Sequence, residues 1–295
     1  MTKTFVLGLG AQKAGTTWVY QFLREHPDCA MGNIKEMGSL SNHFGARANT
    51  KRRFNNIHWL KGALEKFEQD LKSRKLSPEQ TQIVLDRMEN VSSDICFDNY
   101  VRYYSTQLQR KSNAVLTGDI TPEYCMLSET ALEKVKLHLE DYGYRVKAFF
   151  LMRDPVERCF SALRMGHRRA LKAGSPIHSM PHNDFAKKAV DDWQLERTQY
   201  EKIIPKIENV FAPEDRYFGF FETFFTSESI ADFCNFLEIS NTEAKLGRRV
   251  NASPRGEEPS GEEWERVRAA YRETYEYCAI RFGIDLISDI WNYRA

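Results

Sequence analysis

The sequence lacks any apolar run long enough to cross a lipid bilayer, and it carries almost no net charge. Its 42 lysine and arginine residues balance 41 aspartate and glutamate residues, for a formal charge of +1. No overall basic field therefore points to nucleic acid or to a membrane surface. An apolar pattern begins by Thr4 and leaves no room for a signal peptide. We expect a soluble, cytoplasmic protein with no transmembrane segment and no nucleic-acid partner.

Cysteines are also few, six in 295 residues, and none of them lie close together in the sequence. This scatter fits neither a zinc site nor a disulfide framework and is typical of a reducing compartment. There are no internal repeats and no low-complexity linker, and strand patterns alternate with helix patterns along the chain. We expect a single α/β domain over residues 1–295, with a helical insertion at about 55–112.

A short apolar segment and a glycine loop open the chain. Phe5–Leu9 is typical of a buried parallel strand, the loop runs over Gly10–Gly15, and a helical pattern follows. In this architecture the free N–H groups of a loop and the positive end of a helix converge on one anion. We therefore expect the backbone N–H groups of Gly15, Thr16 and Thr17 to bind a phosphate.

The loop has the glycine spacing of a Walker A motif but not its lysine. A nucleoside triphosphatase requires lysine directly after the second glycine, where it reaches the β- and γ-phosphates, and this chain has Thr16 there. The loop's only lysine is Lys13, two residues before Gly15. This favours a nucleotide with a single phosphate at this end, with Lys13 beside the group that leaves or arrives.

The segment Gly-Ala-Gln-Lys-Ala-Gly-Thr-Thr-Trp, which starts at Gly10, resembles the 5′-phosphosulfate loop of sulfotransferases that use 3′-phosphoadenosine 5′-phosphosulfate (PAPS). The resemblance implies an α/β, P-loop-like, three-layer fold with a central, mainly parallel sheet flanked by helices. It also implies PAPS as the cofactor, with no metal. The residues it assigns to the 5′ end are Gln12, Lys13, Ala14, Gly15, Thr16, Thr17 and Trp18. For Trp18, packing of the first helix is the alternative role.

A second strand–turn–helix pattern carries the other half of the resemblance. An apolar strand over 145–152 ends in Arg153, and Ser161 lies eight residues later in a helix. A guanidinium grips phosphate in a bidentate geometry, and a hydroxyl adds one hydrogen bond. The arrangement resembles the 3′-phosphate site of the sulfotransferases, although Arg153 alone would be read as part of a surface ion pair. A late basic loop resembles the family's mobile loop over that phosphate and supplies Arg255, Arg248 and Arg249.

Sulfuryl transfer needs a cation for the leaving oxygen and a base for the acceptor's proton. Lys13 is the candidate cation. Glu36 resembles the base of the Lys-Glu motif in the carbohydrate, heparan-type branch, although the aromatic residues that usually follow closely are replaced here. His43 is the rival base because the small-phenol branch uses histidine. Glu36 could equally form a solvated ion pair with Lys35.

The acceptor is left open by these motifs. A polar loop over residues 37–56 and the helical insertion are expected to form its walls. The acceptor is a small molecule, a lipid or a carbohydrate with a hydroxyl or amine. At the far end of the helix that carries Ser161, the segment 167–169 belongs either to the acceptor side or to a solvated helix end.

Two other functions are compatible with a phosphate-binding loop. One is a P-loop kinase that phosphorylates a small molecule, and the other is a non-catalytic nucleotide-binding protein. The missing lysine at position 16 argues against the kinase.

Overall fold

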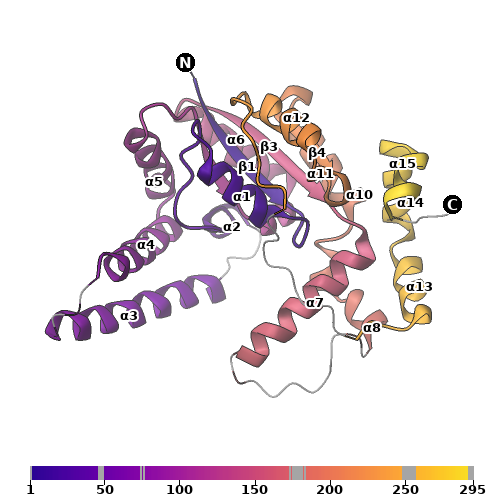
Figure 1. Cartoon of the computed structure of the whole chain (residues 1–295), viewed down its shortest axis with the longest axis horizontal. Helices are drawn as coiled ribbons and strands as arrows, with labels where there is room; N and C mark the ends of the chain where they lie inside the picture. Colours follow the sequence, from indigo (N-terminus) through magenta and orange to yellow (C-terminus); the bar gives the residue numbers. More distant parts are fainter. Residues whose placement is uncertain are drawn as a thin grey trace.

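The computed structural model of the chain describes residues 2–45, 50–73, 75, 77–172, 174, 182, 184–247 and 257–291. Its centre is a four-stranded sheet in the order β2-β1-β3-β4, and every pair of neighbours is parallel (Figure 1). The strands are β1 Lys3–Gly10, β2 Leu116–Ile120, β3 Tyr144–Met152 and β4 Arg216–Phe220. The predicted α/β fold with a parallel sheet is confirmed.

Helices surround this sheet. In chain order they are α1 Thr16–Glu25, α2 Ser39–Phe44, α3 Thr50–Lys72, α4 Pro78–Ile95, α5 Phe97–Arg110, η1 Pro122–Met126, α6 Glu129–Asp141, α7 Pro155–Lys172, α8 Phe185–Ala189, α9 Asp192–Leu195, α10 Tyr200–Val210, η2 Pro213–Asp215, α11 Phe221–Phe224, α12 Ser227–Leu237, α13 Gly261–Ala270, α14 Arg272–Phe282 and α15 Ile284–Trp291. No helix in the part of the chain described is both long and apolar enough to cross a membrane.

Two consecutive side chains of β3 show the three layers. Successive residues of a strand point to opposite faces of the sheet. Phe149 packs edge-on against Phe233 of α12, with ring centroids 5.3 Å apart, while Phe150 packs against Tyr200 of α10 at 5.6 Å. Each face of β3 therefore buries an aromatic side chain under a different helix, as a central sheet flanked on both sides requires.

The strand register brings the functional segments to one edge. Gly8 of β1 lies opposite Ile120 of β2 and opposite Phe149 of β3. Because the strands are parallel, their carboxyl ends open onto the same side of the sheet, where open α/β folds bind ligands. The loop after β1 and the turn after β3, which hold the two predicted phosphate motifs, are thus neighbours.

The expected loop over residues 37–56 is wrong in part, because it contains α2 and the start of α3. A buried carboxylate explains the helical structure. Asp94 of α4 accepts hydrogen bonds from Ser39 Oγ and Asn42 Nδ2, both at 2.8 Å, and from Asn56 Nδ2 at 2.6 Å. The polar residues that read as a loop in the sequence are satisfied by this distant partner.

Helices α3, α4 and α5 fill the region predicted as a helical insertion. Figure 1 shows α3 and α4 extending to one side of the sheet. Helix α5 packs on the sheet itself, since Tyr100 and Tyr104 contact Phe5 of β1 with ring centroids 6.1 and 5.1 Å apart. The projecting part is therefore α3 and α4, whereas α5 belongs to the core.

Candidate active site

The loop between β1 and α1 is fixed by backbone contacts and by two left-handed residues. Ala11 N donates to Leu151 O of β3 at 2.7 Å, which ties the loop to the neighbouring strand. Lys13 has φ 72° and Gly15 has φ 87°, both in the left-handed region. A left-handed conformation is unfavourable for lysine, and such strained residues concentrate at functional sites.

The start of α1 leaves its backbone donors open. Gly15 caps the helix without any side-chain hydrogen bond. The first N–H groups with partners are those of Trp18 and Val19, which both donate to Gly15 O. Within the described chain, the N–H groups of Gly15, Thr16 and Thr17 donate to no protein atom. Such groups at a helix N-terminus are suited to hold a phosphate.

Replacing Gly15 with alanine is expected to destabilise the fold. A Cβ atom there would lie 2.5 Å from Cζ of Phe225, and the left-handed φ adds about 1–3 kcal/mol of strain. The melting temperature and the urea midpoint should both fall. As a matched control, Gly62→Ala places its Cβ in open space within α3 and should raise stability by up to about 1 kcal/mol. Equal stability of the two variants would contradict this account of the loop.

Arg153, directly after β3, reaches the loop between β1 and α1. Its Nη1 atom donates to Lys13 O at 3.2 Å, and its Nη2 atom pairs with Glu157 Oε2 at 3.0 Å. The guanidinium also lies over the ring of Phe221, 4.6 Å from the centroid, and its side chain is only 15% exposed. The ion pair considered for Arg153 is therefore present, but the same guanidinium also links the two motifs.

Buried groups hold the backbone around Arg153. Tyr200 Oη donates to Arg153 O at 2.8 Å and accepts from Arg153 N at 3.3 Å. Asp154 accepts from Tyr275 Oη at 2.8 Å and from Glu157 N at 2.9 Å, and burial raises the pKa of its carboxyl group. The two tyrosines belong to α10 and α14, so no local sequence pattern could have predicted their contacts, whereas the Glu157 N–H belongs to the first turn of α7.

Lys13 lies in a strongly positive environment. The pKa of its ammonium group is lowered to about 8. Burial is the largest cause, followed by the positive charges of Arg168, Arg153, Arg169 and Arg164. The four charges that act most strongly on Lys13 are thus all positive. Concentrated cations facing one point favour an anion there, because the anion relieves their mutual repulsion.

This environment predicts a pH limit for any reaction that needs protonated Lys13. Since the pKa lies near 8, the active ammonium is lost as pH rises through that value, and kcat/KM should fall about tenfold per pH unit above it. Removing a neighbouring charge in Arg168→Gln raises the pKa, so the decline should move to higher pH. A decline at an unchanged pH in that variant would show that another group is titrating.

Ser161 lies on a polar face of α7. Glu157, Ser161, Arg164 and Arg168 are spaced by four, three and four residues, which places them on one side of the helix. Ser161 is buried. Because Glu157 pairs with Arg153 and the two arginines act on Lys13, this side of α7 is the one that belongs to the site. Arg164 was missed in the sequence, although its spacing from Ser161 was a usable signal.

Glu36 follows an extended segment that leads away from α1. It has φ 55°, a second left-handed non-glycine residue in this region. Its carboxylate pairs with Lys35 Nζ and its side chain is 42% exposed. The ion pair proposed as the alternative role is therefore present, and the carboxylate remains accessible to a proton donor.

His43 has a different environment. Its Nε2 atom lies 2.7 Å from Ser93 O of α4, and its ring packs edge-on against Phe97 at 5.9 Å. These contacts join α2 to α4 and α5. They give His43 a packing role and leave Nδ1 as the nitrogen that could accept a proton.

A second buried carboxylate organises the end of β2. Asp119 accepts from Thr121 Oγ1 at 2.8 Å and from Tyr124 Oη at 2.5 Å. Tyr124 Oη in turn lies 3.4 Å from Leu40 N of α2, which donates to it. The end of β2 is thereby connected to the helix that follows Glu36.

Apart from Trp18, four of the remaining residues that are predicted to bind the nucleotide lie in the described part of the chain and three lie outside it. Thr16 is buried, Thr17 is half-buried, and Gln12 has a buried Oε1 atom with no hydrogen-bond partner in the part of the chain that the structure describes. Ala14 is fully buried. Arg248, Arg249 and Arg255 lie outside the described residues.

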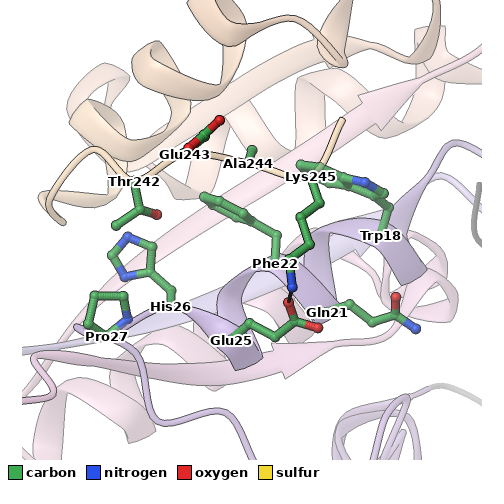
Figure 2. A pocket seen from close by; sticks show the side chains of 10 residues that line it. All are labelled: Trp18, Gln21, Phe22, Glu25, His26, Pro27, Thr242, Glu243, Ala244 and Lys245. Carbon is green, nitrogen blue, oxygen red and sulfur yellow. Dashed lines mark hydrogen bonds and ion pairs between the residues drawn. The ribbon is translucent and has the colours of Figure 1, made fainter. Parts of the chain in front are cut away.

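A hollow of about 260 Å³ lies beside α1, between that helix and residues 242–245 (Figure 2). Trp18 lines one end and stacks on Phe22 with ring centroids 5.4 Å apart. The pair of Glu25 and Lys245 closes one side at 3.3 Å. Of the predicted nucleotide residues that are described, Trp18 alone lines this hollow. The hollow extends from the Trp18 end along α1, so most of it lies away from the loop between β1 and α1.

Comparison with known proteins places this geometry in a known fold. No protein-family model matches the chain, and no curated protein matches it. A sulfotransferase from Alicyclobacillus acidocaldarius matches its structure with a TM-score of 0.53 at 15% identity, over 100% of this chain and 98% of that one. The chain has a sulfotransferase fold.

Two further solved structures match with lower scores. The sulfotransferase domain from the curacin biosynthetic pathway has a TM-score of 0.45 at 14% identity, over 83% of this chain and 76% of that one. The sulfotransferase domain from the Synechococcus PCC 7002 olefin synthase has a TM-score of 0.43 at 15% identity, over 82% and 74%.

Proposed function

We propose that this protein is a sulfotransferase that moves the sulfuryl group of PAPS to a hydroxyl or amine of its acceptor. The observation that supports this best is the contact between Arg153 Nη1 and Lys13 O. This contact brings together two cationic segments, the loop that contains Lys13 and the turn that contains Arg153. Each segment carries one of the two sequence motifs that predict nucleotide binding. A nucleotide with phosphates at both its 3′ and 5′ ends matches two such sites.

Each half of the site binds one end of the donor. The open N–H groups of Gly15, Thr16 and Thr17 hold the 5′-phosphate. Arg153 and Ser161 hold the 3′-phosphate, because a guanidinium offers parallel donors to two phosphate oxygens. From the resemblance, the late arginines Arg255, Arg248 and Arg249 add charge at the same phosphate.

Lys13 and Glu36 act at the transferring group. As the acceptor atom bonds to sulfur, the bond from sulfur to the bridging phosphate oxygen breaks. Lys13 donates a hydrogen bond to that oxygen and stabilises the charge it gains in the transition state. Glu36 takes the proton of the acceptor. We favour Glu36 over His43 because the side chain of Glu36 is 42% exposed, whereas the ring of His43 packs against Phe97 between α2, α4 and α5.

The reaction needs no metal in this proposal, and the free cysteines suit the cytoplasm. A sulfuryl group carries less charge than a phosphoryl group, so Lys13 and backbone donors suffice for it. All six cysteines are free, and five of them are buried.

Calorimetry with adenosine 3′,5′-bisphosphate tests the proposal directly. We expect a dissociation constant on the order of tens of micromolar or tighter, and transfer from labelled PAPS that persists in EDTA. No bisphosphate binding would refute the proposal. Magnesium-dependent ATP turnover would instead indicate a kinase. Bisphosphate binding with no transfer across a broad acceptor panel would indicate a nucleotide-binding protein without catalysis.

A further inference from the structure

Helices α3 and α4 expose more apolar surface than a monomeric protein normally presents to water. The two helices extend to one side of the sheet (Figure 1). Seven large apolar side chains on them are each 44% to 72% exposed, namely Phe54, Ile57, Leu64, Leu71, Leu85, Met88 and Ile95. Together they expose the equivalent of about four whole residues, on the order of 600–800 Å² at roughly 150–200 Å² for each residue. The largest apolar patch of a typical monomer covers about 300–600 Å².

Polar contacts at both ends of the pair fix how α3 faces α4. Asn56 Nδ2 donates to Asp94 Oδ2 at 2.6 Å, and Gln80 Nε2 donates to Asp70 Oδ2 at 2.7 Å. The start of α3 therefore lies beside the end of α4, and the two helices are antiparallel. Because a spacing of seven residues returns to nearly the same side of a helix, positions 56, 63 and 70 of α3 face positions 80, 87 and 94 of α4.

The exposed apolar side chains gather on one side of this helix pair. Positions 57, 64 and 71 each directly follow a contact position of α3, as positions 88 and 95 do in α4. One residue turns the helix by about 100°, and in two antiparallel helices this turn leads to the same side of the pair. We call this surface the α3–α4 face; its central side chains are Ile57, Leu64, Leu71, Met88 and Ile95, and Phe54 and Leu85 border it.

The charges beside the α3–α4 face balance one another. Lys61 pairs with Glu65 at 3.9 Å, and Lys72 pairs with Glu68 at 2.6 Å. All four side chains are exposed, and their signs alternate along α3. Such an arrangement produces no net field that would attract an anionic lipid surface or a nucleic acid. The face therefore suits an apolar protein surface whose own flanking charges alternate in the same way.

A second, antiparallel copy of α3 meets this description. Ile57 and Leu71 lie seven residues on either side of Leu64. A two-fold axis beside Leu64 therefore places Ile57 against the partner subunit's Leu71, and Leu64 against its own counterpart. Lys61 precedes Leu64 by three residues and Glu68 follows it by four, so the same axis brings Lys61 toward the partner subunit's Glu68. The symmetry repeats this pair, which makes the surface complementary to itself in shape and in charge.

We propose that two copies of this chain form a two-fold dimer through the α3–α4 face, with their helix pairs packed as an antiparallel four-helix bundle. Burying the face on both copies removes roughly 1,200–1,600 Å² from water, which is the size of a standard stable interface. The bundle covers the apolar side chains that α3 and α4 otherwise expose. This inference does not depend on the proposed function, because the face lies apart from the residues assigned to nucleotide binding.

Sedimentation velocity of the whole chain at about 20 µM tests the dimer, since interfaces of this size bind with micromolar or tighter affinity. We expect a mass of about 69 kDa, twice the 34.4 kDa of one chain. Leu64→Glu places two carboxylates against each other at the axis and should raise the dissociation constant of the dimer at least 100-fold. Ile280→Glu is the matched control, because Ile280 is 87% exposed on α14, and it should stay dimeric. Melting curves by circular dichroism verify that both variants fold.

Charge reversal tests how the two copies are arranged. Lys61→Glu and Glu68→Lys should each raise the dissociation constant about threefold to tenfold, because two exposed ion pairs are lost. The double variant restores both pairs with opposite signs and should recover the wild-type value. A monomeric wild type at about 100 µM, a Leu64→Glu variant that dimerises normally, or a double variant without recovery would each overturn the inference. Monomers that bind neutral phosphatidylcholine vesicles through Leu64 would assign the face to lipid instead.

Discussion

Replacing Lys13 with methionine is expected to lower kcat by roughly 10²–10³-fold, because one preorganised donor to the developing negative charge is lost. Binding of adenosine 3′,5′-bisphosphate should change little, since the backbone N–H groups and Arg153 remain. Methionine keeps the length of the side chain, so the loop and its packing are preserved. Single-turnover transfer from labelled PAPS and calorimetry on the same preparation separate the two effects.

Lys3→Met is the matched control for this experiment. Lys3 lies at the opposite end of β1, where its Nζ atom donates to Ala114 O at 2.6 Å. The Lys3→Met variant should be somewhat less stable than the wild type, and its kcat should be unchanged. If Lys13→Met transferred sulfuryl groups at the wild-type rate, Lys13 would have no part in the chemistry.

The second large effect is expected for Arg153→Ala. Its guanidinium is mostly buried, contacts the phosphate loop and lies over Phe221. Losing a buried cation that pairs with phosphate should weaken bisphosphate binding by roughly 30-fold or more. Because Lys13 O also loses its partner, the loop should be held less firmly and kcat should fall as well. Arg153→Lys should restore only part of the affinity, since an ammonium has no bidentate geometry.

Arg145→Ala serves as the comparison at the other end of β3. Arg145 pairs with Asp215 at 2.8 Å and with Glu238 at 2.6 Å, so its loss removes a partly buried ion pair far from the site. Stability should fall and bisphosphate affinity should be retained. Equal affinity in Arg145→Ala and Arg153→Ala would remove the basis for the 3′-phosphate assignment.

The fold and the position of the loop between β1 and α1 could be predicted because their signals are local. The apolar run of β1, the glycines that bound the loop and the helical pattern of α1 lie within about 20 consecutive residues. The parallel arrangement then follows from strand–helix alternation, and it places the turn after β3 beside the loop. The contact of Arg153 with Lys13 O is the physical outcome of that topology.

The surroundings of Glu36 and His43 could not be predicted, because distant buried groups determine them. Asp94 lies more than 50 residues after Ser39 and Asn42, yet it anchors both. Without it, the polar sequence of α2 favours a loop. His43 shows the same limit, since its hydrogen bond to Ser93 O crosses 50 residues.

Both residues assigned to the transfer step adopt a backbone conformation that glycine would occupy more readily, with φ 72° at Lys13 and φ 55° at Glu36. Laboratory evolution that rewards heat resistance alone should therefore substitute glycine at positions 13 and 36 and yield sturdier but inactive proteins. Screens for robust variants of this protein need turnover as a second criterion in every round.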